Sequence, residues 1–393
     1  MRAVFLSLGL SLVLSAAATP ASAQCGGSFS NFVNGLKKEA RAKGHSKAQT
    51  DRFFQGVIQD AKVLRFDRAQ NAFKKNFLQF SRAVVSQNRI DHGAKNAKRY
   101  RTSFQAIERQ FGIPQGVLLA FWALETDYGA NQGSFNTLNA LVTLSHDCRR
   151  PELFRPQVFA ALELFERGDF DPATMQGAWA GEIGMVQMLP EDILTKGIDG
   201  DRDGTINLKT SAPDALFTAA NVLSSLGWRA GEPWLQEITL PANFDWSKTG
   251  LDTKLSVKDW QRRGIRARSG QLGAANLQAS VLLPMGRNGP AFLAYPNFEI
   301  YFEWNKSFVY VTSAAYFATR LSGAAPYNRG TPDEGLTADQ MEALQRKLEA
   351  RGHDVGGVDG ILGAKTRAAV QKEQARLGLP ADAWPTPQLF NAL

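Results

Sequence analysis

The sequence has few of the residues that carry nucleophilic or thiolate chemistry: of 393 residues, two are cysteine and four are histidine. No histidine lies in a motif typical of a catalytic base, so a cysteine nucleophile is not favoured. No apolar run reaches the ~20 residues that cross a bilayer, which argues against stable membrane insertion. The formal net charge is +8, yet the basic residues form no arginine-rich stripe interleaved with aromatics. Nucleic acid is therefore not an expected partner.

The first 23 residues have the layout of a secretory signal. Arg2 precedes an apolar run over residues 3–13, and small residues end at Ala23. This order predicts a cleavable signal peptide over residues 1–23 and a soluble mature protein in the periplasm. Two alternatives are an uncleaved membrane anchor and lipidation of Cys25, although Gln24 stands where a small residue would precede a lipidated cysteine.

Cys25 and Cys148 are the candidates for a disulfide. An exported protein meets oxidising conditions that would pair them, whereas the alternative is two separate buried thiols. The bond would close a long loop, which contributes at most ~5 kcal/mol on the chain-entropy view.

The spacing of apolar residues divides the chain into units. Residues 29–110 show the three- and four-residue spacing of packed amphipathic helices, and residues 112–129 predict a largely buried helix. Glycine and proline recur between residues 240 and 312, where a small antiparallel sheet is expected. Its strands are expected among three runs rich in β-branched and aromatic residues: 279–283, 298–302 and 308–312.

A stretch without helical or strand period separates the last unit from the rest. Residues 322–335 are predicted to be an interdomain linker, between a catalytic domain over residues 24–321 and a small domain over residues 336–393. The small domain is expected to contain a helix over 337–351, a glycine-rich turn and a helix over 364–377.

Glu125 is the candidate general acid. It follows the apolar residues Phe121 and Trp122 near the end of the predicted buried helix. Apolar surroundings disfavour a charged carboxylate, so the pKa of Glu125 is expected to rise into the range useful for proton donation. Taken alone, the residue is better interpreted as an ordinary helix-end glutamate, and the neighbouring motifs reverse that preference.

A glycine-rich run over residues 177–190 lies downstream of Glu125. Its glycines permit close approach of backbone to a ligand, and the Gln187 amide is able to bond a sugar or an acetamido group. With the Glu-Thr-x-aromatic-Gly segment that begins at Glu125, this run resembles the B-type lytic murein transglycosylases. The resemblance covers most of residues 29–321 and implies a lysozyme-like, mainly α (α+β) catalytic domain with a small antiparallel β subdomain.

The resemblance also implies substrate contacts. Arg149 and Arg150 stand where the family has paired basic residues near its cleft, and Trp304, Asn305 and Tyr310 match positions that contact sugar. Aromatic side chains cover the apolar faces of sugar rings. For Tyr310 the alternative is packing in the core of the sheet.

Three acids at alternate positions suggest a cation site. Asp199, Asp201 and Asp203 open a loop like that of an EF-hand, and the carbonyl of Thr205 is a further ligand. The twelfth position is not glutamate, and the family resemblance implies that Asp214 closes the site instead. A structural calcium ion is predicted, and no cofactor is expected for catalysis. The alternatives are a solvated turn without metal, sodium, or a weakened site.

Residues 336–393 resemble the small three-helix peptidoglycan-binding domain of wall hydrolases. The resemblance rests on a series of matched positions, among them Leu344-Gln345, Val358-Asp359-Gly360 and Gln371. The implied partner is the peptidoglycan glycan strand, which a tethered domain would hold near the active site. A purely structural appendage is the alternative, and the protein is expected to be a monomer.

The family resemblance implies cleavage of the β-1,4 bond between N-acetylmuramic acid and N-acetylglucosamine, with formation of a 1,6-anhydro ring. A single carboxyl, Glu125, would act as acid and then base, and no second acid stands at a persuasive position. Two alternatives stay open. One is lysozyme-like hydrolysis. The other is a decayed wall-binding scaffold, because Ala178 and Val222 replace the serine and tyrosine usual in the family.

Overall fold

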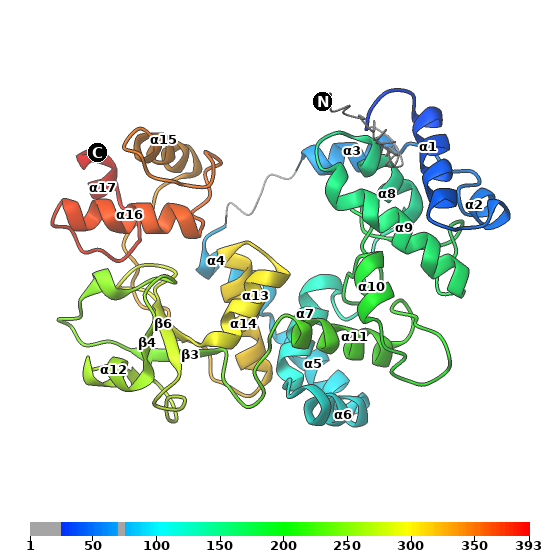
Figure 1. Cartoon of the computed structure of the whole chain (residues 1–393). Helices are drawn as coiled ribbons and strands as arrows, with labels where there is room; N and C mark the ends of the chain where they lie inside the picture. The colour runs from blue at the N-terminus through cyan, green and yellow to red at the C-terminus, as the bar shows by residue number, and fades with distance from the viewer. Residues whose placement is uncertain (1–24, 70–74) are drawn as a thin grey trace, which may run out of the picture.

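The computed structural model describes residues 25–69 and 75–393. The predicted signal peptide over residues 1–23 lies outside them. Within the described residues, the chain as far as residue 225 is mainly helical, with one short strand pair (Figure 1). Its helices are α1 (Phe29–Ala42), α2 (Lys47–Phe53), α3 (Ala61–Arg68), α4 (Phe77–Val84), α5 (Gln87–Arg99), α6 (Arg101–Phe111), α7 (Gln115–Thr126), α8 (Thr137–His146), α9 (Pro151–Arg167), α10 (Pro190–Lys196) and α11 (Ala212–Ser225).

Polar side chains begin many of these helices. Ser46, Asp60 and Ser86 accept hydrogen bonds from backbone N–H groups of the first turns of α2, α3 and α5. At α4, Asn76 and Gln79 form a reciprocal capping box. Such caps satisfy donors that a helix leaves unpaired at its start, so at these four helices the local sequence favours the observed first residue.

The strands form two antiparallel sheets. A small sheet pairs β1 (Phe135–Asn136) with β2 (Gln176–Gly177). The larger sheet has the order β4-β6-β7-β3-β5. Its strands are β3 (Leu235–Thr239), β4 (Leu255–Ser256), β5 (Arg266–Ala267), β6 (Gln278–Leu282) and β7 (Phe292–Ala294), accompanied by the 3-10 helix η1 (Trp246–Lys248) and by α12 (Val257–Arg262).

Two of the predicted strand runs are helices. Residues 298–302 lie in α13 (Pro296–Trp304), and residues 308–312 begin α14 (Phe308–Leu321). Every residue from Phe308 to Ala318 is buried, so α14 shows no polar face. An apolar run that is buried on all sides lacks the helical period, which is why it was mistaken for a strand. The third run was predicted correctly and corresponds to β6.

The C-terminal unit consists of α15 (Ala338–Glu349), α16 (Ala364–Arg376) and α17 (Pro387–Ala392), confirming the three-helix prediction. Figure 1 shows these helices gathered beside the end of the larger sheet, and away from α1, α2 and α9. The described residues form three apolar clusters: a large one in the helical region, one around the larger sheet, and one within α15–α17. The mainly α architecture with a small β subdomain is therefore confirmed.

The segment between the catalytic region and the C-terminal unit has no helix or strand but is packed against both. The Tyr327 hydroxyl lies 2.8 Å from the Ser81 hydroxyl of α4. The Asp333 carbonyl accepts a hydrogen bond of 3.0 Å from the Trp384 indole. Among the described residues, no helix combines the length and apolar character needed to span a bilayer.

Candidate active site

The two residues Asp127 and Tyr128, just after the catalytic helix, are each held by a hydrogen bond to Arg89. α7 ends at Thr126, and Asp127 and Tyr128 both have the left-handed backbone that favours glycine, with φ of 53° and 60°. Arg89 donates to the Asp127 carboxylate at 2.9 Å, and the Tyr128 hydroxyl donates to the Arg89 carbonyl at 2.8 Å. Backbone strain of this kind persists only where the surroundings over-determine it and gathers at functional sites.

Glu125 is partly buried, and two donors from other helices meet one of its oxygens. The Tyr310 hydroxyl of α14 donates to Oε1 at 2.5 Å, and the Trp304 indole of α13 donates to the same oxygen at 2.9 Å. Phe121 of α7 packs on the Trp304 ring with centroids 4.3 Å apart. Burial raises the pKa of Glu125, and the hydrogen bonds from Tyr310 and Trp304 oppose that rise without cancelling it. The carboxyl is thus suited to hold a proton.

A second carboxyl, Glu182, is packed in the same region. Its Oε2 is buried and has no hydrogen-bond partner among the described residues. Burial raises the pKa of Glu182, the Glu125 charge raises it further, and Arg150 is close enough to lower it. Glu182 is unusual in the glycine-rich run, but the sequence gives no signal of whether an acid there faces the cleft, so no role was predicted for it.

The glycine-rich run forms a tight turn beside the catalytic helix. Ile183 and Met188 pair across it, and Gln187 occupies the left-handed region with φ of 52°. A Cβ on Gly184 would lie 2.5 Å from the Leu208 carbonyl oxygen, so this position excludes other residues. The Thr126 hydroxyl donates to the Met185 carbonyl at 2.6 Å, which fixes the turn to the residue after Glu125.

Two candidate sugar contacts use part of their amides locally. Gln187 donates to the Gly184 carbonyl at 2.8 Å, within its own turn. Asn305 follows α13, and its Oδ1 accepts from the Ser307 N–H at 2.9 Å. Asn305 lies one residue after Trp304, so the chain places it beside the donors of Glu125.

Arg149 and Arg150 converge on a buried carboxylate instead of on Glu125. Arg149 donates to Asp67 at 2.6 Å, and Arg150 also pairs with Asp67, whose side chain is 1% exposed. Burial raises the pKa of Asp67, but the hydrogen bonds from the two arginines outweigh it and lower the pKa below its ordinary value. Asp67 lies in α3, more than eighty positions earlier in the chain, and the sequence gives no sign of this partnership.

The acidic loop fits a hard cation. Oxygens of Asp199, Asp201 and Asp203 lie within 4.8 Å of one another. Thr205 donates from its backbone N–H to the Asp203 carboxylate at 2.9 Å. Asp214 is outside this group: its oxygens accept N–H bonds from Gly200 at 2.8 Å and Asn207 at 2.7 Å, so it braces the backbone of the loop. Oxygen-only donor sets suit calcium.

A helix-end carboxyl with a raised pKa, in a mainly helical domain, is typical of glycan-cleaving enzymes of the lysozyme type. Comparison with known proteins narrows this class. The profile of the Transglycosylase SLT domain family matches residues 28–319, and that of a peptidoglycan binding domain family matches residues 337–393. The chain belongs to the Transglycosylase SLT domain family, as the sequence motifs predicted.

Individual relatives agree with this assignment. Membrane-bound lytic murein transglycosylase B of Escherichia coli K12 is 25% identical over 300 residues, which cover 72% of this chain and 81% of that protein. The crystal structure of SltB3 from Pseudomonas aeruginosa, in complex with NAG-anhNAM-pentapeptide, is 34% identical with a TM-score of 0.85. That match covers 93% of this chain and 99% of SltB3.

A more distant structure shares the fold of the catalytic region. The Escherichia coli lytic transglycosylase Slt35 in complex with calcium is 24% identical, with a TM-score of 0.64. The match covers 76% of this chain and 96% of Slt35.

Proposed function

We propose that this enzyme is a lytic transglycosylase that cleaves the β-1,4 bond between N-acetylmuramic acid and N-acetylglucosamine in peptidoglycan and leaves a 1,6-anhydro-muramyl end. The observation that carries the proposal is the convergence of Tyr310 and Trp304 on Oε1 of Glu125. Two donors on one oxygen leave the proton of the acid on the other oxygen, Oε2, from which it is donated.

The reaction needs one carboxyl and no water. Glu125 gives its proton to the glycosidic oxygen as the bond to the muramyl C1 breaks, and the 2-acetamido group of the substrate stabilises the cationic centre. The muramyl 6-hydroxyl then attacks C1, and its proton goes to the ionised Glu125. A new C1–O6 bond replaces the old glycosidic bond, and the acid is regenerated. One group serves as acid and base because the two proton transfers occur in sequence.

Sugar contacts are proposed for the residues around this acid. Trp304 and Tyr310 donate to Glu125, Asn305 directly follows Trp304 in the chain, and Gln187 is held in the adjoining turn. Arg149 and Arg150 are engaged with Asp67, so their contacts with sugar stay a prediction.

A calcium ion is proposed for the acidic loop, as a structural and not a catalytic group. Asp199, Asp201 and Asp203 would hold it with the Thr205 carbonyl, and Asp214 would keep the loop in shape. The convergence of the three carboxylates supports this, and the related Slt35 was crystallised in complex with calcium.

Product analysis tests the reaction. Mature protein is incubated with purified sacculi, and the released muropeptides are weighed by mass spectrometry. Anhydro ends, one water lighter than reducing ends, are the expected result. Reducing ends would instead favour lysozyme-like hydrolysis, and no released material would favour a decayed scaffold. Glu125→Gln should bind sacculi without turnover, whereas Glu163→Gln, at an exposed position of α9, serves as the matched control.

The periplasm is the proposed location, and the monomer is the proposed state. A disulfide joins Cys25 and Cys148, and such bonds persist in oxidising compartments. Cell fractionation with N-terminal sequencing is the test. A periplasmic protein that begins at Gln24 is expected, and retention of residues 1–23 in the membrane fraction would contradict it. Light scattering of the purified protein tests the monomer.

A further inference from the structure

One face of α16 is polar and buried. Arg367, Gln371 and Gln374 are spaced by four and three positions, so they lie along one side of the helix. Arg367 and Gln374 are 7% and 3% exposed. The polar face of a helix at the surface of a domain usually contacts water. Because this face is buried, it contacts another part of the same chain.

The partner is the β subdomain of the catalytic region. Arg367 donates to the Leu283 carbonyl at 3.3 Å and to the Pro284 carbonyl at 2.7 Å, just after β6. Gln371 donates to the Thr249 carbonyl at 2.9 Å. Side chains of the small domain thus satisfy backbone acceptors of the larger one, which a loosely tethered domain would leave to water.

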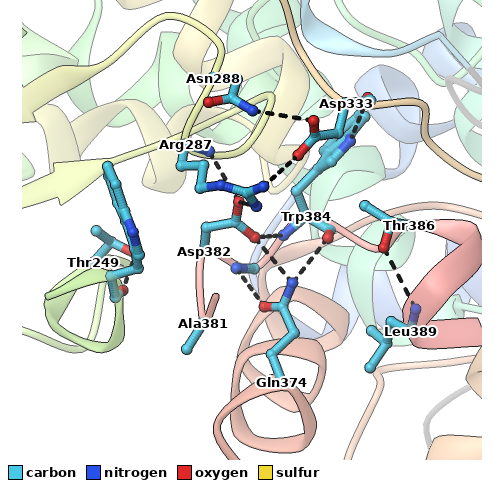
Figure 2. Close-up of polar contacts among 12 residues, drawn as sticks. Thr249, Arg287, Asn288, Asp333, Gln374, Ala381, Asp382, Trp384, Thr386 and Leu389 are labelled. Atoms are coloured by element: carbon cyan, nitrogen blue, oxygen red, sulfur yellow. Dashed lines mark hydrogen bonds and ion pairs between the residues drawn. The ribbon is translucent and has the colours of Figure 1, made fainter. Parts of the chain in front are cut away.

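A second set of contacts surrounds Asp382, which is 2% exposed (Figure 2). Its Oδ2 accepts from the Arg287 backbone N–H at 3.0 Å, and its Oδ1 accepts from Gln374 at 2.9 Å. Arg287 also pairs with Asp333 of the connecting segment at 3.1 Å. Figure 2 shows the Arg287 guanidinium between the Asp333 and Asp382 carboxylates. The connecting segment, the loop after β6 and the small domain are therefore joined at one place.

The same interface reaches the helix that carries Tyr310. The Arg367 guanidinium carbon lies 4.5 Å from the centroid of the Phe308 ring, and Phe308 is the first residue of α14. Tyr310 is two residues further along and donates to Glu125. The planar guanidinium of Arg367 stacks on the Phe308 ring and at the same time donates hydrogen bonds to two carbonyls. The ammonium of a lysine cannot make both interactions with this geometry.

We infer that the C-terminal domain is a fixed part of the catalytic unit, and that Arg367 is a positioning residue that holds the first turn of α14 so that Tyr310 meets Glu125. This inference rests on the proposed function. It differs from tethering, in which the domain only raises the local concentration of enzyme on the wall. Tethering has no effect on a short soluble substrate, whereas positioning acts on every substrate.

The test compares full-length variants on a short soluble peptidoglycan oligosaccharide. Arg367→Met should lower kcat by about tenfold with little change in KM, because a small misplacement of a catalytic group is costly. Arg367→Lys should restore only part of the rate. Lys365→Met, at an exposed position of the same helix, should behave as the wild type.

The pH profile gives a readout that lost stability alone would not move. Tyr310 stabilises the ionised form of Glu125, so a misplaced Tyr310 lets the pKa of Glu125 rise and moves the alkaline limb of kcat to higher pH. The titratable groups that face this pair are Glu182 from the glycine-rich turn and Tyr301 from α13. They are unchanged in Arg367→Met, which isolates the effect.

Folded Arg367→Met with the kcat and pH profile of the wild type on the soluble substrate would overturn the inference, even if its binding to sacculi were lost. If Arg367→Met does not fold, Phe308→Leu removes the ring under the guanidinium and should move the same alkaline limb. An unmoved limb in Phe308→Leu would equally refute positioning. Failure of the proposed function looks different, because the wild type itself would then release no anhydro product.

Discussion

At the scale of single residues, the protonation of Glu125 reflects two opposing influences. Burial favours the neutral acid, while hydrogen bonds from Tyr310 and Trp304 favour the carboxylate. Burial is the larger, so the pKa is raised. Both donors bind Oε1 and leave Oε2 free to carry the proton. Burial therefore keeps the acid protonated, and the two hydrogen bonds stabilise the carboxylate after the proton has been donated.

Tyr310→Phe removes one of these donors without changing the ring. The pKa of Glu125 should rise further, so the alkaline limb of the pH–kcat profile moves to higher pH. Loss of a donor that stabilises the carboxylate should also lower kcat by about 10²-fold. Steady-state kinetics over a pH series measures both effects. Trp304→Phe removes the other donor and should move the limb in the same direction; opposite shifts would exclude this account of Glu125.

The buried carboxyl of Glu182 should make the stability of the fold depend on pH. Burial raises the pKa of Glu182 in the folded protein above its ordinary value. The stability associated with the neutral form is thus complete below the unfolded pKa and is lost as pH rises through the folded pKa. Glu182→Gln cannot ionise and should avoid that loss. Thermal melts from mildly acidic to alkaline pH should show the variant gaining on the wild type, and parallel curves would mean that Glu182 is not buried as a neutral acid.

At the scale of elements, Asp67 holds α3 against the start of α9. Asp67→Asn leaves Arg149 and Arg150 without their carboxylate, so unfolding should require ~3 kcal/mol less, as is usual when one partner of a buried pair is removed. Urea denaturation at neutral pH measures this. Because the pKa of Asp67 is lowered, the contribution is present above the unfolded pKa and is lost as pH falls through the folded pKa, where variant and wild type should converge.

The exposed pair between Arg68 and Asp147 is the natural control for Asp67. Arg68→Ala should change stability by at most ~1 kcal/mol, since solvent screens such pairs. Equal losses in Asp67→Asn and Arg68→Ala would contradict a special role for the buried carboxylate.

Calcium bound in the acidic loop should stabilise the folded protein. Calcium that binds only the folded state should add ~2.7 kcal/mol at a concentration about 100 times its Kd. Differential scanning calorimetry with calcium and with a chelator is the measurement. Asp201→Asn, which removes one converging carboxylate, should reduce the difference between the two melts. A wild-type midpoint that does not respond to chelator would leave the loop as a solvated turn.

The helices and strands that the sequence predicts correctly are those determined by local patterns of residues. The amphipathic helices before residue 110 and the helices α15 and α16 were predicted correctly, because the spacing of their apolar residues and the glycines between them are local signals. α13 and α14 were not, because their aromatic and β-branched residues are typical of strands and because α14 is buried from Phe308 to Ala318. Here tertiary burial outweighs local propensity.

The same contrast applies to the site. Glu125 and the acidic loop stand in short motifs that the sequence displays directly. The contact between Tyr310 and Glu125 joins residues 185 positions apart, and that between Arg149 and Asp67 joins residues 82 apart. Family resemblance placed Tyr310 in the site, but the direction of each hydrogen bond depends on packing between helices, which no local pattern records.

At the scale of the whole molecule, the disulfide and the α16 interface connect distant parts of the chain to the catalytic core. The bond between Cys25 and Cys148 spans 123 positions and fixes the beginning of the described chain beside the end of α8. Gly26 donates to the His146 carbonyl at 2.8 Å, and the Gly27 carbonyl lies 3.0 Å from the His146 ring nitrogen Nε2. Three adjacent contacts at one place make α1 part of the same folded unit as α8.

Reduction of this disulfide should weaken that unit more than the rest. A long closed loop contributes up to ~5 kcal/mol, mainly by restricting the unfolded chain. Melts with and without reductant should therefore show a lower midpoint for the reduced protein, and limited proteolysis should cut first near α1. The Cys25→Ser/Cys148→Ser variant should have the midpoint of the reduced wild type, and reductant should not change that midpoint. Equal midpoints for oxidised and reduced protein would show that the packing of Phe29 and Phe32 against His146 suffices alone to hold α1 in place.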